Sequence, residues 1–175
     1  FNFQITTANL TITANAANRT YGGAIFSGSA GSVSFTTSGL QNSAAIGSVT
    51  IAYASGAGSG NELTSSVATY VGKVTASLPT GGTFTASNYN ILYAAGNIVV
   101  VPANLTITAS NATKVYGETK TFAGTEFSAV GLLNTDAVNS VTLTSAGAAS
   151  TASATTYTIT PSSASGTGLS NYNIT

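Results

Sequence analysis

A repeated segment constrains the fold more than any other feature of this sequence. The seven residues Ala8–Ala14 (ANLTITA) recur unchanged as Ala103–Ala109. Four further matches keep the same order along the chain: Tyr21-Gly22 with Tyr116-Gly117, Gly39-Leu40 with Gly131-Leu132, Ser48–Ile51 with Ser140–Leu143, and Asn88–Ile91 with Asn171–Ile174. Self-similarity over such a long distance is typical of tandem modules. We therefore expect two copies of one design rather than one fold around one site.

Both copies are predicted to consist of β-strands. Apolar residues alternate with Thr and Ser in the repeated segment, in Val49–Tyr53 and in Tyr157–Ile159, and a period of two is typical of half-buried strands. Residues 40–45 and 132–138 are the only candidates for a helical turn, and a plain turn explains them equally well. The predicted fold class is mostly β, with tandem β-grasp-like or β-sandwich-like modules that hold at most a short helical turn each.

Matching the two copies predicts the domain limits. Residues 91–102 close the first module with a strand that ends at Pro102, so we expect module 1 over residues 8–102 and module 2 over residues 103–175. Module 2 is the shorter copy, and the surplus of module 1 lies mainly in the Gly/Ser-rich stretch Ser55–Ser66. Strand sequences persist while loop lengths vary, as expected of surface connections.

The two ends of the sequence complement each other. Module 2 stops after Asn171–Ile174 without a counterpart of the closing strand of module 1. Residues 1–7 place an alternating segment directly before the repeated segment, with apolar side chains at Phe1, Phe3 and Ile5. We predict that residues 1–7 are the closing strand of a preceding module, supplied within one chain or by a neighbouring chain. An unpaired apolar edge invites aggregation, which gives this strand complementation a physical motive.

Low charge argues against several classes of partner. Only 5% of the residues are charged and the formal net charge is zero, against about 25% charged residues in an ordinary domain. The four cations are scattered along the chain: Arg19, Lys73, Lys114 and Lys120. Nucleic-acid affinity arises from many clustered phosphate contacts, so nucleic acid is not an expected partner.

The absence of histidine and cysteine argues against an enzyme. It removes the commonest general base, the commonest metal ligand and every thiolate nucleophile. The acids also lack the spacing of a calcium loop. The only nearby acid pair, Glu118 and Glu126, is not repeated in module 1, where Gly23 stands opposite Glu118. We expect no catalytic residues, no cofactor and no metal.

Cysteine usage and hydropathy bear on location. A small secreted eukaryotic domain usually carries disulfides, so a chain with no cysteine favours a bacterial exterior. The sequence has no basic-plus-apolar signal segment and no apolar run near 18 residues. We therefore expect a processed or excised piece that is extracellular and does not insert into a membrane.

The repeated segments resemble a known family. Lys114–Thr119 (KVYGET), Gly131-Leu132, Asn171–Ile174 and the junction from Tyr93 to Ala109 are similar to the YGX-type MBG repeat domain and its YDG-type relatives. The resemblance covers nearly the whole chain twice, although module 1 has Arg19–Gly23 where module 2 has Lys-Val-Tyr-Gly-Glu. It implies tandem modules of large bacterial surface adhesins, filamentous-haemagglutinin-like and exported by two-partner secretion, at the cell surface or in a biofilm matrix. It lends no ligand-binding or catalytic residue.

Four tyrosines recur at matched places, namely Tyr21, Tyr89, Tyr116 and Tyr172. A buried ring with a hydrogen-bonded hydroxyl would anchor each module, and this structural role is the one we predict. Stacking of the same rings on sugars is the alternative, which would make the chain a module binding matrix polysaccharide. A weaker alternative is ice binding by alternate threonines, which the long repeat disfavours. The predicted function is a structural repeat of an adhesin or matrix fibre whose partner is another copy of itself.

Overall fold

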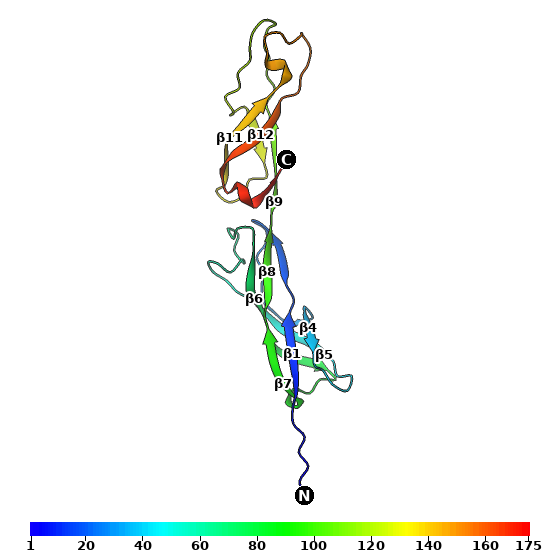
Figure 1. The fold of residues 1–175 in the computed structure, drawn as a ribbon. Helices are drawn as coiled ribbons and strands as arrows, with labels where there is room; N and C mark the ends of the chain where they lie inside the picture. Colours follow the sequence, from blue (N-terminus) through cyan, green and yellow to red (C-terminus); the bar gives the residue numbers. More distant parts are fainter. The chain divides into compact units, whose positions relative to one another are not determined.

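The structure, a computed structural model, describes all 175 residues and divides into two compact units. Unit 1 is Phe1–Val101 and unit 2 is Pro102–Thr175. Thirteen strands and three short 3-10 turns make up the regular structure (Figure 1). The prediction of a mostly β chain built from tandem modules is confirmed.

Unit 1 contains eight strands in two sheets. They are β1 (Ala8–Ala14), β2 (Ala17–Thr20), β3 (Ser29–Ser32), β4 (Phe35–Ser38), β5 (Ile46–Tyr53), β6 (Ala68–Gly82), β7 (Tyr89–Ala94) and β8 (Gly96–Val101). The first sheet has the order β4-β1-β7 and the second has the order β2-β8-β6-β5-β3. Residues 1–7 precede β1 and belong to no strand (Figure 1).

Two long extended runs pass through both sheets of unit 1. β1 continues into β2, and β7 continues into β8. Both pairings are parallel, with Ala8 opposite Tyr89 in the first sheet and Thr20 opposite Val101 in the second. The two runs leave one sheet together and enter the other together, which places β8 between β2 and β6. A side chain at Gly96 would obstruct this step, because a Cβ there would lie 2.4 Å from the carbonyl oxygen of Ala14.

Unit 2 repeats part of this design with five strands. They are β9 (Ala103–Ala109), β10 (Phe127–Val130), β11 (Ala137–Thr144), β12 (Thr160–Thr167) and β13 (Tyr172–Ile174), in sheets of order β10-β9-β13 and β11-β12. β13 lies parallel to β9 with Ala103 opposite Tyr172, which is the register of β7 on β1. β10 lies antiparallel to β9 with Phe127 opposite Ala109, which is the register of β4 on β1. Residues 102–175 contain no counterpart of β2 or β8.

The two units also share unusual backbone positions. Gly39 and Gly131 have φ of 104° and 108°, and a Cβ at either would lie 2.3 or 2.4 Å from the carbonyl oxygen of Asn9 or Asn104. Only glycine suits such a position. Leu78 and Ser163 have φ of 46° and 48° at matched irregularities in the β5–β6 and β11–β12 pairings. The duplication therefore extends to local backbone geometry.

The helical turns lie outside the two segments considered from the sequence. Residues 40–45 and 132–136 form turns without helix, and residues 137–138 already belong to β11. The 3-10 turns are η1 (Ala86–Asn88), η2 (Ala146–Ala148) and η3 (Leu169–Asn171). η1 and η3 stand directly before β7 and β13 and so belong to the shared design, whereas η2 occurs in unit 2 alone.

Each unit has a core of its own. The buried apolar residues of unit 1 are Leu10, Ile12, Ala14, Tyr21, Val49, Ile51, Val74, Ala76, Ile98 and Val100. Those of unit 2 are Ala103, Leu105, Ile107, Val141, Leu143 and Tyr172. β8 supplies Ile98 and Val100 to the first list, so β8 is a core strand of unit 1.

Candidate functional site

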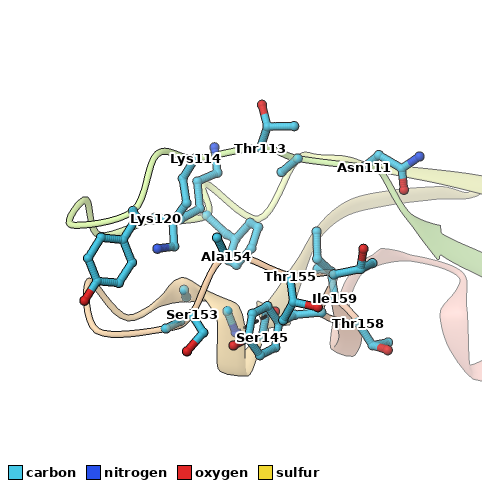
Figure 2. Close-up of a pocket in the computed structure, with 18 of the residues that line it drawn as sticks. Asn111, Thr113, Lys114, Lys120, Ser145, Ser153, Ala154, Thr155, Thr158 and Ile159 are labelled. Carbon is cyan, nitrogen blue, oxygen red and sulfur yellow. Dashed lines mark hydrogen bonds between the residues drawn. The ribbon is translucent and has the colours of Figure 1, made fainter.

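Unit 2 contains an open groove of about 740 Å³. Residues 110–114 and Tyr116 line one side, and residues 152–159 line the other. Lys120, Phe122 and the η2 region complete the lining. Figure 2 shows Asn111, Thr113 and Lys114 on one segment, facing the segment that carries Ala154, Thr155 and Ile159. We call this feature the unit 2 groove.

The unit 2 groove corresponds to the place that β8 fills in unit 1. Counting from the repeated segment, residues 112–115 correspond to β2, Ala17–Thr20. The far side, Tyr157–Ile159, corresponds to the part of β6 that contains Tyr70 and Val74. The match is supported by ring packing, since a Cβ on Gly147 would meet the Tyr157 ring at 2.6 Å and one on Gly60 would meet the Tyr70 ring at 2.4 Å. In unit 1, β8 is hydrogen-bonded to both of these segments.

Local contacts hold the near side of the unit 2 groove in a loop rather than a strand. The N–H of Val115 donates to a carboxylate oxygen of Glu118 at 3.3 Å, and Nζ of Lys114 donates to the Glu118 carbonyl oxygen at 3.1 Å. Both groups are exposed to solvent. The segment is therefore tied to its own turn by two weakly protected hydrogen bonds.

The N-terminal segment, residues 1–7, exposes large apolar side chains to solvent. Phe3 and Ile5 are 90% and 84% exposed, and Phe1 is fully exposed. Three successive apolar side chains at alternate positions thus lie in solvent on one segment. Large apolar side chains grouped in this way mark interaction surfaces more often than isolated ones do.

Residues 105–175 match the family model of the MBG domain (YGX type). Unit 2 is therefore similar to the MBG domain of the YGX type. The match contains Lys114–Thr119, Gly131-Leu132 and Asn171–Ile174, which are three of the segments that carry the resemblance. No curated protein and no solved structure matches the chain. Unit 1 shares the sheet order and strand register of unit 2 around β1, as described above.

The four recurrent tyrosines occupy two different environments. Tyr89 and Tyr172 are a matched pair, since the N–H of Gln41 donates to the Tyr89 hydroxyl at 3.0 Å and the N–H of Leu133 donates to the Tyr172 hydroxyl at 2.8 Å. In unit 2 the Tyr172 hydroxyl also donates to Asp136 Oδ2 at 2.7 Å. Each hydroxyl therefore holds the turn that follows Gly39 or Gly131.

Tyr21 and Tyr116 do not match in their surroundings. Tyr21 is 4% exposed, and its N–H donates to the Val101 carbonyl oxygen at the end of β8. Tyr116 is 69% exposed and lines the unit 2 groove. Tyr21 follows β2, which pairs with β8, whereas Tyr116 follows residues 112–115, which form no strand in unit 2. The burial expected for Tyr116 is not found, and the physical reason is this difference in pairing.

Arg19 is a structural residue that the sequence alone did not single out. It is 6% exposed, and its guanidinium donates to the carbonyl oxygens of Gly23, Ala24, Gly60 and Glu62. Two of these acceptors lie in the Gly/Ser-rich surplus of unit 1. The departure of unit 1 from the Lys-Val-Tyr-Gly-Glu pattern therefore coincides with an arginine that binds the unit 1 insertion. Two features of the sequence could have indicated this role: Arg19 is one of only four cations, and module 1 carries the longer loop.

Two acids of unit 2, Glu118 and Glu126, accept hydrogen bonds from backbone N–H groups of their own loops. The N–H of Ala123 contributes most to holding the pKa of the Glu126 carboxyl below its usual value, and the N–H groups of Glu126 itself, Gly124 and Thr125 act in the same direction. Glu118 accepts from Val115 as described above. No cluster of three or more His, Cys, Asp or Glu side chains that could hold a metal ion occurs in the structure. None of its helical segments has the length and apolar character needed to cross a bilayer.

Proposed function

We propose that the chain is a structural repeat of a secreted bacterial adhesin or extracellular matrix fibre, which mediates surface attachment, cell–cell adhesion or biofilm formation. The observation that carries the proposal is the tandem duplication, in which two units repeat the same strand register around β1 and β9. Tandem repetition builds length without requiring any new site in each copy. The match to the MBG domain supports the same role.

The proposed role is not catalytic. Glu118 and Glu126 both accept hydrogen bonds from N–H groups of their own loops. The single buried cation, Arg19, donates only to backbone carbonyl oxygens. These charged side chains stabilise loops, which supports a structural use of the residues that an enzyme would need for chemistry.

Localisation on intact bacteria tests the proposal. An antibody raised against residues 102–175 should label the surface of cells that produce the parent protein, and immunogold electron microscopy would show the label on external fibres. Deleting these residues in frame should reduce attachment to a surface. Labelling that appears only after the cells are permeabilised would overturn an extracellular role.

Polysaccharide binding is the second candidate function. It is favoured by Tyr116, whose exposed ring lines the unit 2 groove together with Tyr157, because aromatic side chains offer large, rigid contact faces. Binding of the purified chain to a glycan array should be lost in Tyr116→Ala and kept in the neighbouring exposed variant Val115→Ala. An array without any bound glycan would count against this candidate and leave the structural role in place.

A further inference from the structure

We propose that the unit 2 groove binds residues 1–6 of a second copy of this chain as an added β-strand. The inference rests on the proposed function, because it names the contact through which one repeat would associate with the next. It requires a groove between two segments that can pair with an added strand on one copy, and a segment with inward-facing apolar side chains at alternate positions on the other. Unit 1 provides the comparison for both, because β8 fills the corresponding place there.

Unit 1 shows what the opening accepts. β8 lies parallel to β2 on one side and antiparallel to β6 on the other. Its residues alternate between buried and half-buried from Gly96 to Val100, and the side chains of Ile98 and Val100 are 0% and 1% exposed. A strand placed in the matching opening of unit 2 should therefore present two apolar side chains inward, two residues apart.

Residues 1–6 have this pattern at the same distance from the repeated segment as β8 does. Ile5 stands three residues before the repeated segment at Ala8, and Val100 stands three residues before it at Ala103. By the same count Phe3 matches Ile98 and Asn2 matches Asn97. Phe3 and Ile5 are exposed where Ile98 and Val100 are buried. The segment thus carries the inward pattern of β8 with nothing covering it.

The pairings of β8 predict the register of the added strand. In unit 1, Ile98 lies opposite Ala17 and Tyr70, and Val100 lies opposite Arg19 and Ala68. Transferred to unit 2, Phe3 of the second copy would lie between Ala112 and Tyr157. Its ring would then meet the Tyr157 ring, and residues 112–115 would become a strand like β2.

Phe1 lies outside this register. It matches Gly96, where a Cβ would lie 2.4 and 2.6 Å from the carbonyl oxygens of Ala14 and Asn15. The corresponding backbone of unit 2 is that of Ala109 and Ser110, so a side chain at this position of the added strand would meet the same obstruction. We therefore assign the inward positions to Phe3 and Ile5 and place Phe1 beyond the end of the added strand, which narrows the prediction that all three residues take part.

Two single substitutions test the inference on the purified 175-residue chain. Phe3→Glu puts a charge on the inward face of the donor, with Gln4→Glu as its outward control. Ala112→Glu does the same on the groove, with Thr113→Glu as its control, because Ala17 is half-buried and Asn18 exposed in the matching strand β2. All four positions are solvent-exposed in the single chain, so each variant is expected to fold.

Analytical ultracentrifugation gives the first readout. The unsubstituted chain and both controls should form oligomers that grow with concentration. Phe3→Glu alone and Ala112→Glu alone should each remain monomeric. An equimolar mixture of the two should form a one-to-one dimer and nothing larger, because one partner keeps only the groove and the other keeps only the donor strand. An unsubstituted chain that stays monomeric, or a mixture that does not dimerise, would overturn the inference.

Disulfide trapping gives the register. The chain has no cysteine, so Gln4→Cys can be added to the Ala112→Glu chain and Thr156→Cys to the Phe3→Glu chain. These positions match Val99 and Thr69, which lie opposite each other in unit 1, and a disulfide needs Cα atoms within about 7 Å. Rapid crosslinking is expected for this pair and slow crosslinking when Asn2→Cys replaces Gln4→Cys. Equal rates would overturn the assigned register.

The same variants, together with two peptide segments, distinguish other possible occupants of the unit 2 groove. If a carrier bearing residues 96–101 binds the unit 2 groove and one bearing residues 1–6 does not, the second-copy assignment is overturned. A crosslink within a single chain that carries Gln4→Cys and Thr156→Cys would also overturn it. Failure in these assays leaves the surface-labelling test of the proposed function untouched, and failure of that labelling would leave the dimer result standing.

Discussion

Unit 1 and unit 2 share one design but differ in whether it is closed. Around β1 and β9 they agree in sheet order and register. They differ at β8, which in unit 1 inserts between β2 and β6 and buries Ile98 and Val100. Val74 is buried where its counterpart Ile159 is half-buried. One strand therefore decides how well the core of the shared design is covered.

The largest expected effect comes from weakening β8 in unit 1. Ile98→Ala should lower the free energy of unfolding of unit 1 by about 2–5 kcal/mol, as do other truncations of fully buried aliphatic residues. The difference between the units would then become smaller, because the core of unit 1 would no longer be fully covered by β8. Hydrogen exchange read by mass spectrometry measures the two units separately.

Phe3→Ala is the matched control for Ile98→Ala, since it occupies the corresponding position with an exposed side chain. At a concentration where the chain is monomeric, its effect should stay within about 0.5 kcal/mol. Equal effects of the two substitutions would contradict the view that β8 closes unit 1.

Arg19→Ala is expected to have the next largest effect. It leaves the carbonyl oxygens of Gly60 and Glu62 without the guanidinium donor, and loss of hydrogen bonds to a buried charged group should cost roughly 3 kcal/mol. The insertion Ser55–Ser66 should become sensitive to limited proteolysis. The same change at the matched Lys114, whose recorded bond is exposed, should alter stability by less than about 0.5 kcal/mol.

The matched tyrosines Tyr89 and Tyr172 allow a comparison of smaller effects on the stability of the two units. Tyr89→Phe removes a hydroxyl that bonds to the backbone of Gln41 and should cost about 1 kcal/mol. Tyr172→Phe also removes the bond to the Asp136 carboxylate, and bonds to charged groups contribute about 1.5–3 kcal/mol. Thermal denaturation of the two variants should rank them in this order. A second substitution, Asp136→Ala, should reduce the difference between them.

The smallest predicted effect depends on pH and is confined to unit 2. Because N–H donors hold the pKa of Glu126 below its usual value, the folded state binds this proton less readily than the unfolded chain does. The stabilisation is present above the usual pKa near 4.5 and is lost as pH falls through the lowered value. The protection factors of residues 110–126 in hydrogen exchange, each relative to the unfolded chain at the same pH, should therefore fall between about pH 5 and pH 3, and Glu126→Gln should remove part of this dependence. A loss of protection confined to unit 1, where Ser34 occupies the matched position, would contradict the assignment.

The repeated segments predicted the part of the fold that both units share. The alternation in Ala8–Ala14 and its copy predicted β1 and β9, and Asn-Tyr-Asn-Ile marked the strands that pair with them. The strongest conformational demands fall on glycines such as Gly39, where the close approach of a backbone carbonyl leaves no room for a Cβ. The strands could be predicted because alternation has a period of two, and the shared glycines and turns could be located because the same residues recur in both copies.

The features that the sequence did not predict depend on long-range contacts. Tyr21 and Tyr116 have the same local sequence role, but one is buried beside β8 and the other is exposed. The exclusion of Phe1 from the proposed register follows from the close approach at Gly96, which is visible only in three dimensions. Arg19 reaches carbonyl oxygens more than 40 residues away. Matching two copies of a sequence therefore identifies equivalent positions but not equivalent environments.

The parallel pairing of the first and last strands has a consequence for a chain under tension. In unit 1 the incoming chain enters at the start of β1 and leaves at the end of β8, and the runs β1-β2 and β7-β8 are hydrogen-bonded along their length. A pull on these two ends would slide the runs past each other in shear, so many backbone hydrogen bonds would carry the load together instead of opening one after another. Forced unfolding is governed by the unfolding rate, and a concerted rupture of this kind makes that rate small. A domain joined in this way would resist the drag of flowing water on an attached cell.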